Sequence, residues 1–272
     1  TQVQFEFGAV KLLQQECERV GISRPLLITD AGVKAAGVLQ KALDALPGLP
    51  VTVFDQTPSN PTEAAVRAAA AMYKAHGCDG LIAVGGGSSI DLAKGVAILA
   101  THPGNLKTYA TIEGGSAKIT DAAAPLIAVP TTAGTGSEAT RFTIITDTET
   151  DEKMLCAGLA YLPQIAVVDY ELTLTKPARL TADTGIDSLV HAIEAYVSKR
   201  ANPFADSMAL SAMRLIWPNL PRACADPGDR VARESLMLGA LPLYATCTIF
   251  EPTAALNNSP ARWGKPPAPL DE

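Results

Sequence analysis

The chain has 272 residues, of which 47% are hydrophobic, and this is enough for a large core in one large domain or two ordinary ones. Its formal net charge is −6 without a block of Lys or Arg, and no apolar run reaches the roughly 18–20 residues of a membrane span, so we expect neither nucleic acid nor membrane as a partner. Five scattered cysteines without metal-ligand spacing favour reduced thiols and a cytoplasmic location.

The first 170 residues alternate short apolar runs with Ala-rich runs. The apolar runs are bounded by Gly, Pro or Asp, and we expect them to form buried strands at 26–30, 51–54, 81–84, 126–129 and 165–169. Between them we expect helices at 32–46, 62–76 and 88–100. This alternation predicts a parallel sheet covered on both faces, with ligands bound at the carboxyl ends of its strands.

Three consecutive glycines, Gly85, Gly86 and Gly87, follow a predicted strand and lead directly into a helix. Glycine backbone can approach an anion closely, and the N–H groups at a helix start point towards it. We expect Ser88 to be the N-cap of this helix and Asp91 the acidic partner of a capping box. The pattern favours a phosphate-bearing ligand, although a Gly-rich turn also occurs where a strand and a helix only pack closely.

The second half of the chain becomes helical after a predicted β-hairpin at 142–146 and 153–156. One helix carries an apolar stripe at helical spacing, made of Ile186, Leu189, Val190, Ile193 and Val197. Further helices are expected at 204–220 and 231–240. From 241 to 272 the chain contains six prolines and little periodicity, which predicts coil.

Beside the apolar stripe, Asp187 and His191 lie one turn apart on the same side of the helix. A carboxylate and an imidazole at this spacing can share one divalent metal such as Fe²⁺, Zn²⁺ or Mn²⁺. The same pair also occurs on solvated helix faces, where it stabilises a helix by only about 0.2–0.5 kcal/mol. We interpret Glu138 and Glu194 as residues that support the structure.

Three motifs occur in this order: GGGSSIDLAK at 85–94, PTTAGTGSE at 130–138 and GIDSLVHAIE at 185–194. Together they resemble the iron-containing (group III) alcohol dehydrogenase family, and the resemblance extends over residues 5–240. It implies hydride transfer between an alcohol carbon and NAD(P), with a divalent metal as Lewis acid, in a cleft between two domains.

The resemblance implies an α/β domain at 1–172 with a parallel, Rossmann-like, dinucleotide-binding sheet. It implies a truncated all-α domain at 173–240, which would hold the metal and the substrate, and it leaves 241–272 outside the family pattern. The expected substrate is a small alcohol, aldehyde or ketone. We also expect a homo-oligomer, most simply a dimer, because missing helices would leave apolar faces uncovered.

The resemblance also assigns site residues. It implies that the cofactor contacts Asn60, Gly85, Gly86, Gly87, Ser88, Thr131, Thr132, Thr135 and Lys153. Asp30 ends a strand, and there a carboxylate would bind the adenosine ribose and repel the extra phosphate of NADP, which favours NAD. Asp187 and His191 would bind the metal, Fe²⁺ or Zn²⁺. Read from the residues alone, Asp30 is also a candidate helix cap, and Lys153 is also a candidate for an ordinary exposed lysine.

The chain departs from the family at its C-terminal end. The family holds its metal with one aspartate and three histidines, two of them downstream of the third motif, whereas no histidine follows His191 here. We therefore expect weak metal binding and slow or absent turnover. The alternatives are a non-catalytic NAD-binding truncated product or accessory subunit, and a related enzyme such as a maleylacetate reductase, a glycerol dehydrogenase or a dehydroquinate-synthase-like lyase.

Overall fold

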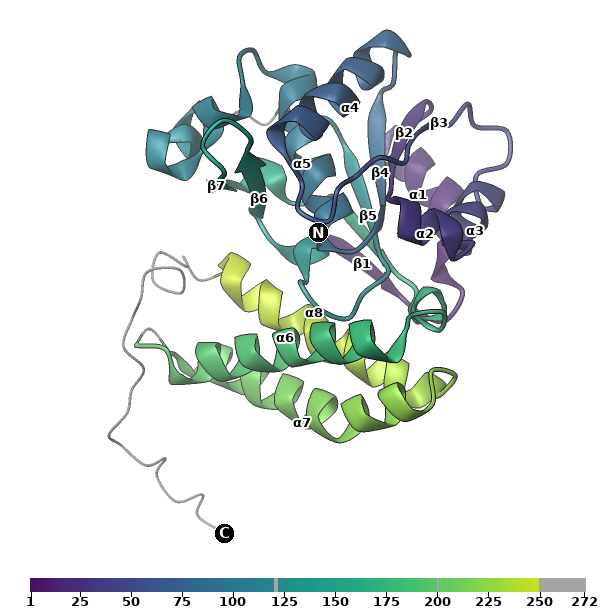
Figure 1. Cartoon of the computed structure of the whole chain (residues 1–272), viewed down its shortest axis with the longest axis vertical. Helices are drawn as coiled ribbons and strands as arrows, with labels where there is room; N and C mark the ends of the chain where they lie inside the picture. The colour runs from purple at the N-terminus through teal and green to yellow at the C-terminus, as the bar shows by residue number, and fades with distance from the viewer. Residues whose placement is uncertain (120–121, 200, 250–272) are drawn as a thin grey trace.

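The structure is a computed structural model that describes residues 1–119, 122–199 and 201–249. Its centre is a six-stranded parallel sheet with the strand order β1-β8-β5-β4-β2-β3 (Figure 1). The strands are β1 (Gln2–Phe5), β2 (Pro25–Ile28), β3 (Thr52–Phe54), β4 (Gly80–Gly85), β5 (Leu126–Pro130) and β8 (Ile165–Val168). The predicted parallel α/β fold and its five strands are confirmed, and the edge strand β1 has no counterpart among the predicted elements.

Helices cover both faces of this sheet, with α4 and α5 on one face and α1 to α3 on the other (Figure 1). They are α1 (Leu13–Val20), α2 (Ala31–Ala35), α3 (Val38–Asp44), α4 (Glu63–Ala75) and α5 (Gly87–Thr101). The helix predicted at 32–46 is divided into α2 and α3, because Gly37 adopts a left-handed conformation with φ of 74° between them. The start of α4 is as predicted, since Thr62 caps it by accepting a hydrogen bond from the Ala65 N–H at 3.2 Å.

The sheet separates two apolar clusters, because successive side chains of a strand point to opposite faces. One set packs under α4 and α5: Leu26, Ile28, Leu81, Ala83, Leu126 and Ala128. The alternating set packs under α1 and α3: Leu27, Ile82, Val84, Ile127, Val129 and Val167. Burial on both faces explains why these strands are continuously apolar in the sequence.

A two-stranded antiparallel hairpin lies beside α5, formed by β6 (Phe142–Asp147) and β7 (Glu152–Ala157). It confirms the predicted hairpin. The Thr143 hydroxyl donates to the backbone carbonyl of Asp91 at 2.8 Å and ties β6 to the helix. Short 3-10 helices occupy several connections: η1 (Ala9–Leu12), η2 (Leu106–Tyr109), η3 (Thr111–Glu113), η4 (Gly115–Lys118), η5 (Ser137–Ala139), η6 (Leu159–Tyr161) and η7 (Tyr170–Thr173).

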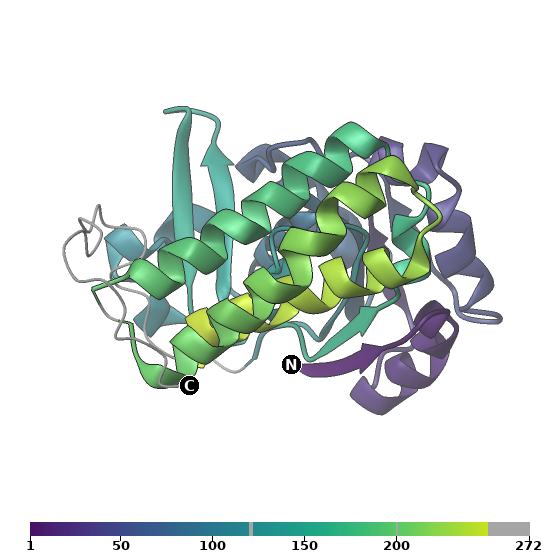
Figure 2. The ribbon, with the colours of Figure 1, turned by 90° about the horizontal axis from the view of Figure 1, so that it is seen from below.

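Three long helices follow the sheet: α6 (Ala178–Val197), α7 (Pro203–Ala225) and α8 (Arg230–Ile249). Figure 2 shows them side by side across one end of the α/β part. Met237 of α8 packs on Ala166 and Val168 of β8, so this layer is attached directly to the sheet. None of the helices in the described part of the chain is both long and apolar enough to cross a membrane.

The packing of α6 differs from what its apolar stripe suggests. Ile186, Val190 and Ile193 are 44–48% exposed, whereas Gly185 and Ala192 are buried. A Cβ on Gly185 would lie 3.1 Å from a methyl carbon of Leu220 on α7. At Gly185 the helices approach so closely that only a small residue fits, whereas Leu189 of the predicted stripe is buried as expected.

The coil predicted from 241 onwards is wrong for the first part of that segment, since α8 continues to Ile249. Pro242 lies inside α8 and removes one backbone hydrogen bond of the helix, but no further proline occurs before Pro252, and the helix continues past it. Residues 250–272, to which the same prediction applies, lie outside the described residues.

Candidate functional site

The two glycine-rich motifs meet at the carboxyl ends of adjacent strands. Gly85 at the end of β4 pairs with Pro130 at the end of β5, and the Thr131 N–H donates to the Gly85 carbonyl at 2.9 Å. This is the edge at which parallel α/β sheets bind ligands. The loops therefore lie together because of strand register, as the sequence predicted.

The start of α5 provides an anion-binding geometry, although not the predicted cap. Gly86 is the N-cap, and no side chain caps the helix. The Ser88 hydroxyl donates instead to the Ser59 carbonyl at 2.6 Å, so its prediction as N-cap is wrong. The helix begins one residue earlier than predicted, and this moves Asp91 out of the capping-box position. The first N–H groups of α5 thus remain available to an acceptor in the cleft.

The three glycines lie close to neighbouring side chains. A Cβ on Gly85 would lie 2.7 Å from the Ser89 Cβ, and this glycine is fully explained by the close packing of strand and helix. A Cβ on Gly87 would lie 2.5 Å from the Thr135 Oγ1, at a position that lines a cleft. Gly87 therefore fits a cradle whose backbone approaches a ligand, and a dinucleotide pyrophosphate suits it.

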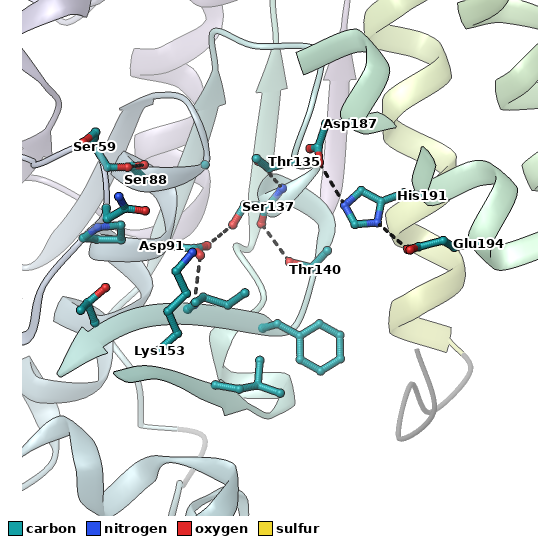
Figure 3. A pocket seen from close by; sticks show the side chains of 17 residues that line it. Ser59, Ser88, Asp91, Thr135, Ser137, Thr140, Lys153, Asp187, His191 and Glu194 are labelled. Atoms are coloured by element: carbon teal, nitrogen blue, oxygen red, sulfur yellow. Dashed lines mark hydrogen bonds and ion pairs between the residues drawn. The ribbon is translucent and has the colours of Figure 1, made fainter. Parts of the chain in front are cut away.

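The cleft, of about 480 Å³, lies between the α/β part and α6 (Figure 3). Of the sequence-predicted cofactor residues, those that line it are Asn60, Gly87, Ser88, Thr135 and Lys153. Thr131 is buried, with 4% exposed, and Thr132 packs against Gly86, where a Cβ would lie 3.2 Å from the Thr132 methyl carbon. These two threonines therefore contact Gly85 and Gly86 and do not line the cleft.

Asp30 acts as a helix cap in the structure. Its Oδ1 accepts a hydrogen bond from the Val33 N–H at 2.9 Å at the start of α2, which is the alternative that the sequence left open. Its Oδ2 accepts a hydrogen bond from the Ser89 hydroxyl at 3.3 Å. The residue lies next to Gly85 but not in the lining of the 480 Å³ cleft.

On the opposite side of the cleft, α6 presents Asp187, His191 and Glu194 (Figure 3). His191 Nε2 lies 3.5 Å from Asp187 Oδ1, and His191 Nδ1 lies 3.6 Å from Glu194 Oε2. The side chains of Asp187 and His191 are nearly half exposed. Glu194, which the sequence analysis gave a supporting role, reaches the same cleft because it is one further turn along α6.

A carboxylate and an imidazole have the donor chemistry of a transition-metal site. The described residues nevertheless contain no group of three or more His, Cys, Asp or Glu arranged to hold a metal. Metal sites in proteins normally use at least three protein ligands. Within the described part of the chain, Asp187 and His191 therefore provide two ligands, which is fewer than such a metal site normally uses.

An ionic cluster that sequence reasoning missed is formed by Asp91, which lines the cleft, and by Lys94 and Glu138, which are buried beneath it. Lys94 is completely buried, with its Nζ 3.9 Å from Asp91 Oδ1. Burial lowers the pKa of Lys94 to about 8 and raises the pKa of Glu138 to about 7. Asp91 and Lys94 belong to the first motif at i, i+3 spacing, which was the available signal, but the sequence does not show which segment covers them.

Comparisons with known proteins agree with this arrangement. Residues 1–170 match the family described as iron-containing alcohol dehydrogenase, and residues 181–249 match the C-terminal part of the Fe-containing alcohol dehydrogenase family. The chain belongs to the iron-containing alcohol dehydrogenase family. The resemblance drawn from the three motifs is thereby confirmed.

Relatives in this alcohol dehydrogenase family extend beyond the matched region. The chain is 59% identical over 241 residues to a 4-hydroxybutyrate dehydrogenase of Cupriavidus necator, covering 89% of this chain and 63% of that protein. The crystal structure of a 1,3-propanediol oxidoreductase superposes with a TM-score of 0.86 and 39% identity, covering 90% of this chain and 64% of the other. A sulfoacetaldehyde reductase from Bifidobacterium kashiwanohense in complex with NAD+ has a TM-score of 0.83 and 32% identity, with 90% and 64% covered. The chain thus spans less than two thirds of the length of these relatives.

Proposed function

We propose that this chain supplies the cofactor-binding part of an NAD-linked alcohol dehydrogenase, which transfers hydride between an alcohol carbon and the nicotinamide ring. The observation that carries the proposal is one cleft that joins the start of α5 to Asp187 and His191 on α6. Family membership and the NAD+ complex of the sulfoacetaldehyde reductase support the same cofactor.

The backbone N–H groups of Gly87 and Ser88 would bind the pyrophosphate, because they lie at an uncapped helix N-terminus. Thr135 and Lys153 would contact the cofactor from the opposite walls of the cleft, one from the loop after β5 and the other from β7. Asp30 would favour NAD over NADP through its negative charge near the adenosine ribose. The bound NAD supplies the hydride-accepting ring.

The hairpin gives the cleft an apolar wall made of Phe142, Ile144 and Leu155. Such a wall orients a small carbon chain and keeps water away from it. The names of the relatives point to 4-hydroxybutyrate and 1,3-propanediol, which both carry a terminal hydroxyl group on a short chain. We therefore propose short primary alcohols with a second polar group, and the corresponding aldehydes, as substrates.

Asp187 and His191 would bind Fe²⁺ or Zn²⁺, which in this position would act as a Lewis acid on the substrate oxygen. Because two ligands leave a hydrated and weakly held ion, we infer that these residues alone bind metal poorly and that the 272-residue polypeptide turns over slowly or not at all. The same incomplete donor set favours a second candidate function, NADH binding without catalysis.

One experiment separates the two candidates. NADH is titrated into the protein, followed by its fluorescence, with and without EDTA. NADH formation from 4-hydroxybutyrate or 1,3-propanediol is then measured with added Fe²⁺ or Zn²⁺. We expect saturable NADH binding that EDTA does not change, together with little turnover. Turnover that is lost with EDTA would support the dehydrogenase and contradict the inferred weak metal site, whereas absence of NADH binding would contradict both candidates.

We also propose that the chain self-associates as a dimer. The support is the apolar stripe on α6, where Ile186, Val190 and Ile193 are each nearly half exposed, because contiguous exposed apolar side chains mark contact surfaces. Light scattering tests this, and a protein that stays monomeric at micromolar concentration would contradict it.

A further inference from the structure

Lys94 on α5 is buried completely, yet its ammonium group is surrounded by oxygen atoms of one short segment. Its Nζ donates to Ser137 Oγ at 3.0 Å, to the Thr140 carbonyl at 2.9 Å, to Thr140 Oγ1 at 3.0 Å and to the Phe142 carbonyl at 2.6 Å. An ammonium group has three hydrogens, so these four oxygens share all of its donor capacity. All of them belong to residues 137–142, which connect the second glycine-rich motif to β6.

Asp91 holds the same segment from the cleft side. Its carboxylate accepts hydrogen bonds from the Ser137 hydroxyl and, at 3.0 Å, from the Ile144 N–H (Figure 3). Asp91, Ser137 and Ile144 line the cleft, whereas the side chain of Lys94 does not reach it. Two side chains of α5 thus hold residues 137–144: Asp91 at the surface of the cleft and Lys94 beneath it.

Burial of a lysine costs stability unless its charge and its donors are used. Here every hydrogen-bond partner of Lys94 lies in the cleft wall or directly behind it. We propose that Lys94 is a positioning residue, whose ammonium group holds Ser137, Thr140 and Phe142 in the geometry that receives the dinucleotide. This inference rests on the proposed NAD-binding function of the same cleft.

A pH dependence follows from this arrangement. The charged groups that face Lys94 are Asp91 on α5 and Glu138 on η5, and both favour its protonated form, but burial outweighs them and lowers the pKa of Lys94 to about 8. A neutral amine keeps two hydrogens for four oxygen atoms, so one hydrogen bond is lost above that pH. NADH binding should therefore weaken as pH rises from 7 to 9, together with looser backbone packing in residues 137–144.

The test compares Lys94→Met with Lys107→Met. The control residue is an exposed lysine that bonds Asp147 at 3.0 Å, at the far end of β6, so its loss removes a lysine contact to the same strand away from the cleft. Amide hydrogen exchange of residues 137–144 is measured without cofactor, and the NADH dissociation constant is measured at pH 7, 8 and 9. For Lys94→Met we expect faster exchange and NADH binding weakened by about tenfold or more, without further change with pH. Lys107→Met should retain the wild-type values and the wild-type pH profile.

Circular dichroism shows whether Lys94→Met is folded. A folded variant with wild-type exchange and wild-type NADH affinity would overturn the proposal. If the variant does not fold, the wild-type protein decides. Exchange is then expressed as a protection factor, which removes the intrinsic rise of the exchange rate with pH, and protection of residues 137–144 that does not fall between pH 7 and 9 overturns the proposal as well. Absence of NADH binding by the wild type at every pH contradicts the proposed function, whereas the exchange measurements still test the positioning role separately.

Discussion

On one side of the cleft, residues 85–88 join β4 to α5. Strand register and close packing around the glycines hold these residues in place. The buried Lys94 of α5 holds the neighbouring segment that contains Thr140. On the other side, Asp187 and His191 project from α6 with nearly half of each side chain exposed. The first region is supported by contacts from several segments of the chain. The second depends on a single helix and on a donor set that the described residues do not complete.

This difference indicates that the residues proposed to bind the cofactor and those proposed to bind the metal have separate structural supports in this chain. A pyrophosphate needs a helix start and a close backbone, and both are local to one strand–helix unit. A metal needs ligands that converge from several elements. We therefore expect NADH affinity to be independent of whether Asp187 and His191 hold a metal ion.

The largest expected effect is at the start of α5. Gly87→Ala would place a methyl group 2.5 Å from Thr135 Oγ1, where we propose that the pyrophosphate binds, and we expect NADH affinity to fall by about 100-fold, or roughly 3 kcal/mol. Fluorescence titration measures this. Gly228→Ala, in a turn away from the cleft, is the control and should bind as the wild type does. Unchanged affinity in Gly87→Ala would show that the glycine serves only close packing against Thr135.

The second effect concerns Glu138 in the buried cluster and the pH dependence of protein stability. Burial raises the pKa of Glu138 to about 7 in the folded protein, so the folded state binds a proton more tightly than the unfolded chain does. Stability is therefore lost as pH rises from about 4.5 through 7. Glu138→Gln removes this cost, and we expect it to be more stable than the wild type by about 2 kcal/mol at pH 8 but equal at pH 5, as measured by urea unfolding. A less stable variant at pH 8 would mean that the attraction between the charges of Glu138 and Lys94 outweighs the cost of burying the carboxylate.

A smaller effect is expected at Asp30, for whose charge we propose a role in the choice between NAD and NADP. Asn is a good N-cap, so Asp30→Asn keeps the hydrogen bond to Val33 while it removes the charge. We expect NADPH binding to improve relative to NADH by about tenfold. Asp44→Asn, an exposed residue on α3, controls for net charge. If the NADPH to NADH ratio is the same in both variants, Asp30 is a helix cap and no more.

The smallest effect tests the independence of the two sides directly. In His191→Ala, NADH affinity should stay within about twofold of the wild type, since its ion-pair contacts with Asp187 and Glu194 are made within α6. Residual Zn²⁺ binding, followed by calorimetry, should disappear. His76→Ala, an exposed histidine at the end of α4, should keep both properties. A large loss of NADH affinity in His191→Ala would join the two regions into one cooperative site.

Much of the fold was predictable because its signals are local. Apolar runs bounded by Gly, Pro or Asp marked the buried strands, and the Thr62 cap marked the start of α4. The single helix predicted at 32–46 failed at Gly37, because composition does not reveal whether a glycine adopts a left-handed conformation. The apolar stripe of α6 indicated the buried face only in part, since Leu189 is buried but Ile186, Val190 and Ile193 are nearly half exposed, and a close helix contact falls at Gly185 instead.

The sequence by itself determined the order of strands and helices, the position of the glycine loop at a strand end, and the spacing of Asp187 and His191, since each depends on residues near one another in the chain. Only the tertiary structure decided that Thr135 and Lys153 reach the cleft while Thr131 is buried, and that Lys94 lies beneath residues 137–142. These outcomes depend on which distant segment covers each side chain. Local pattern carries no information about that covering, because burial is a property of the packed chain.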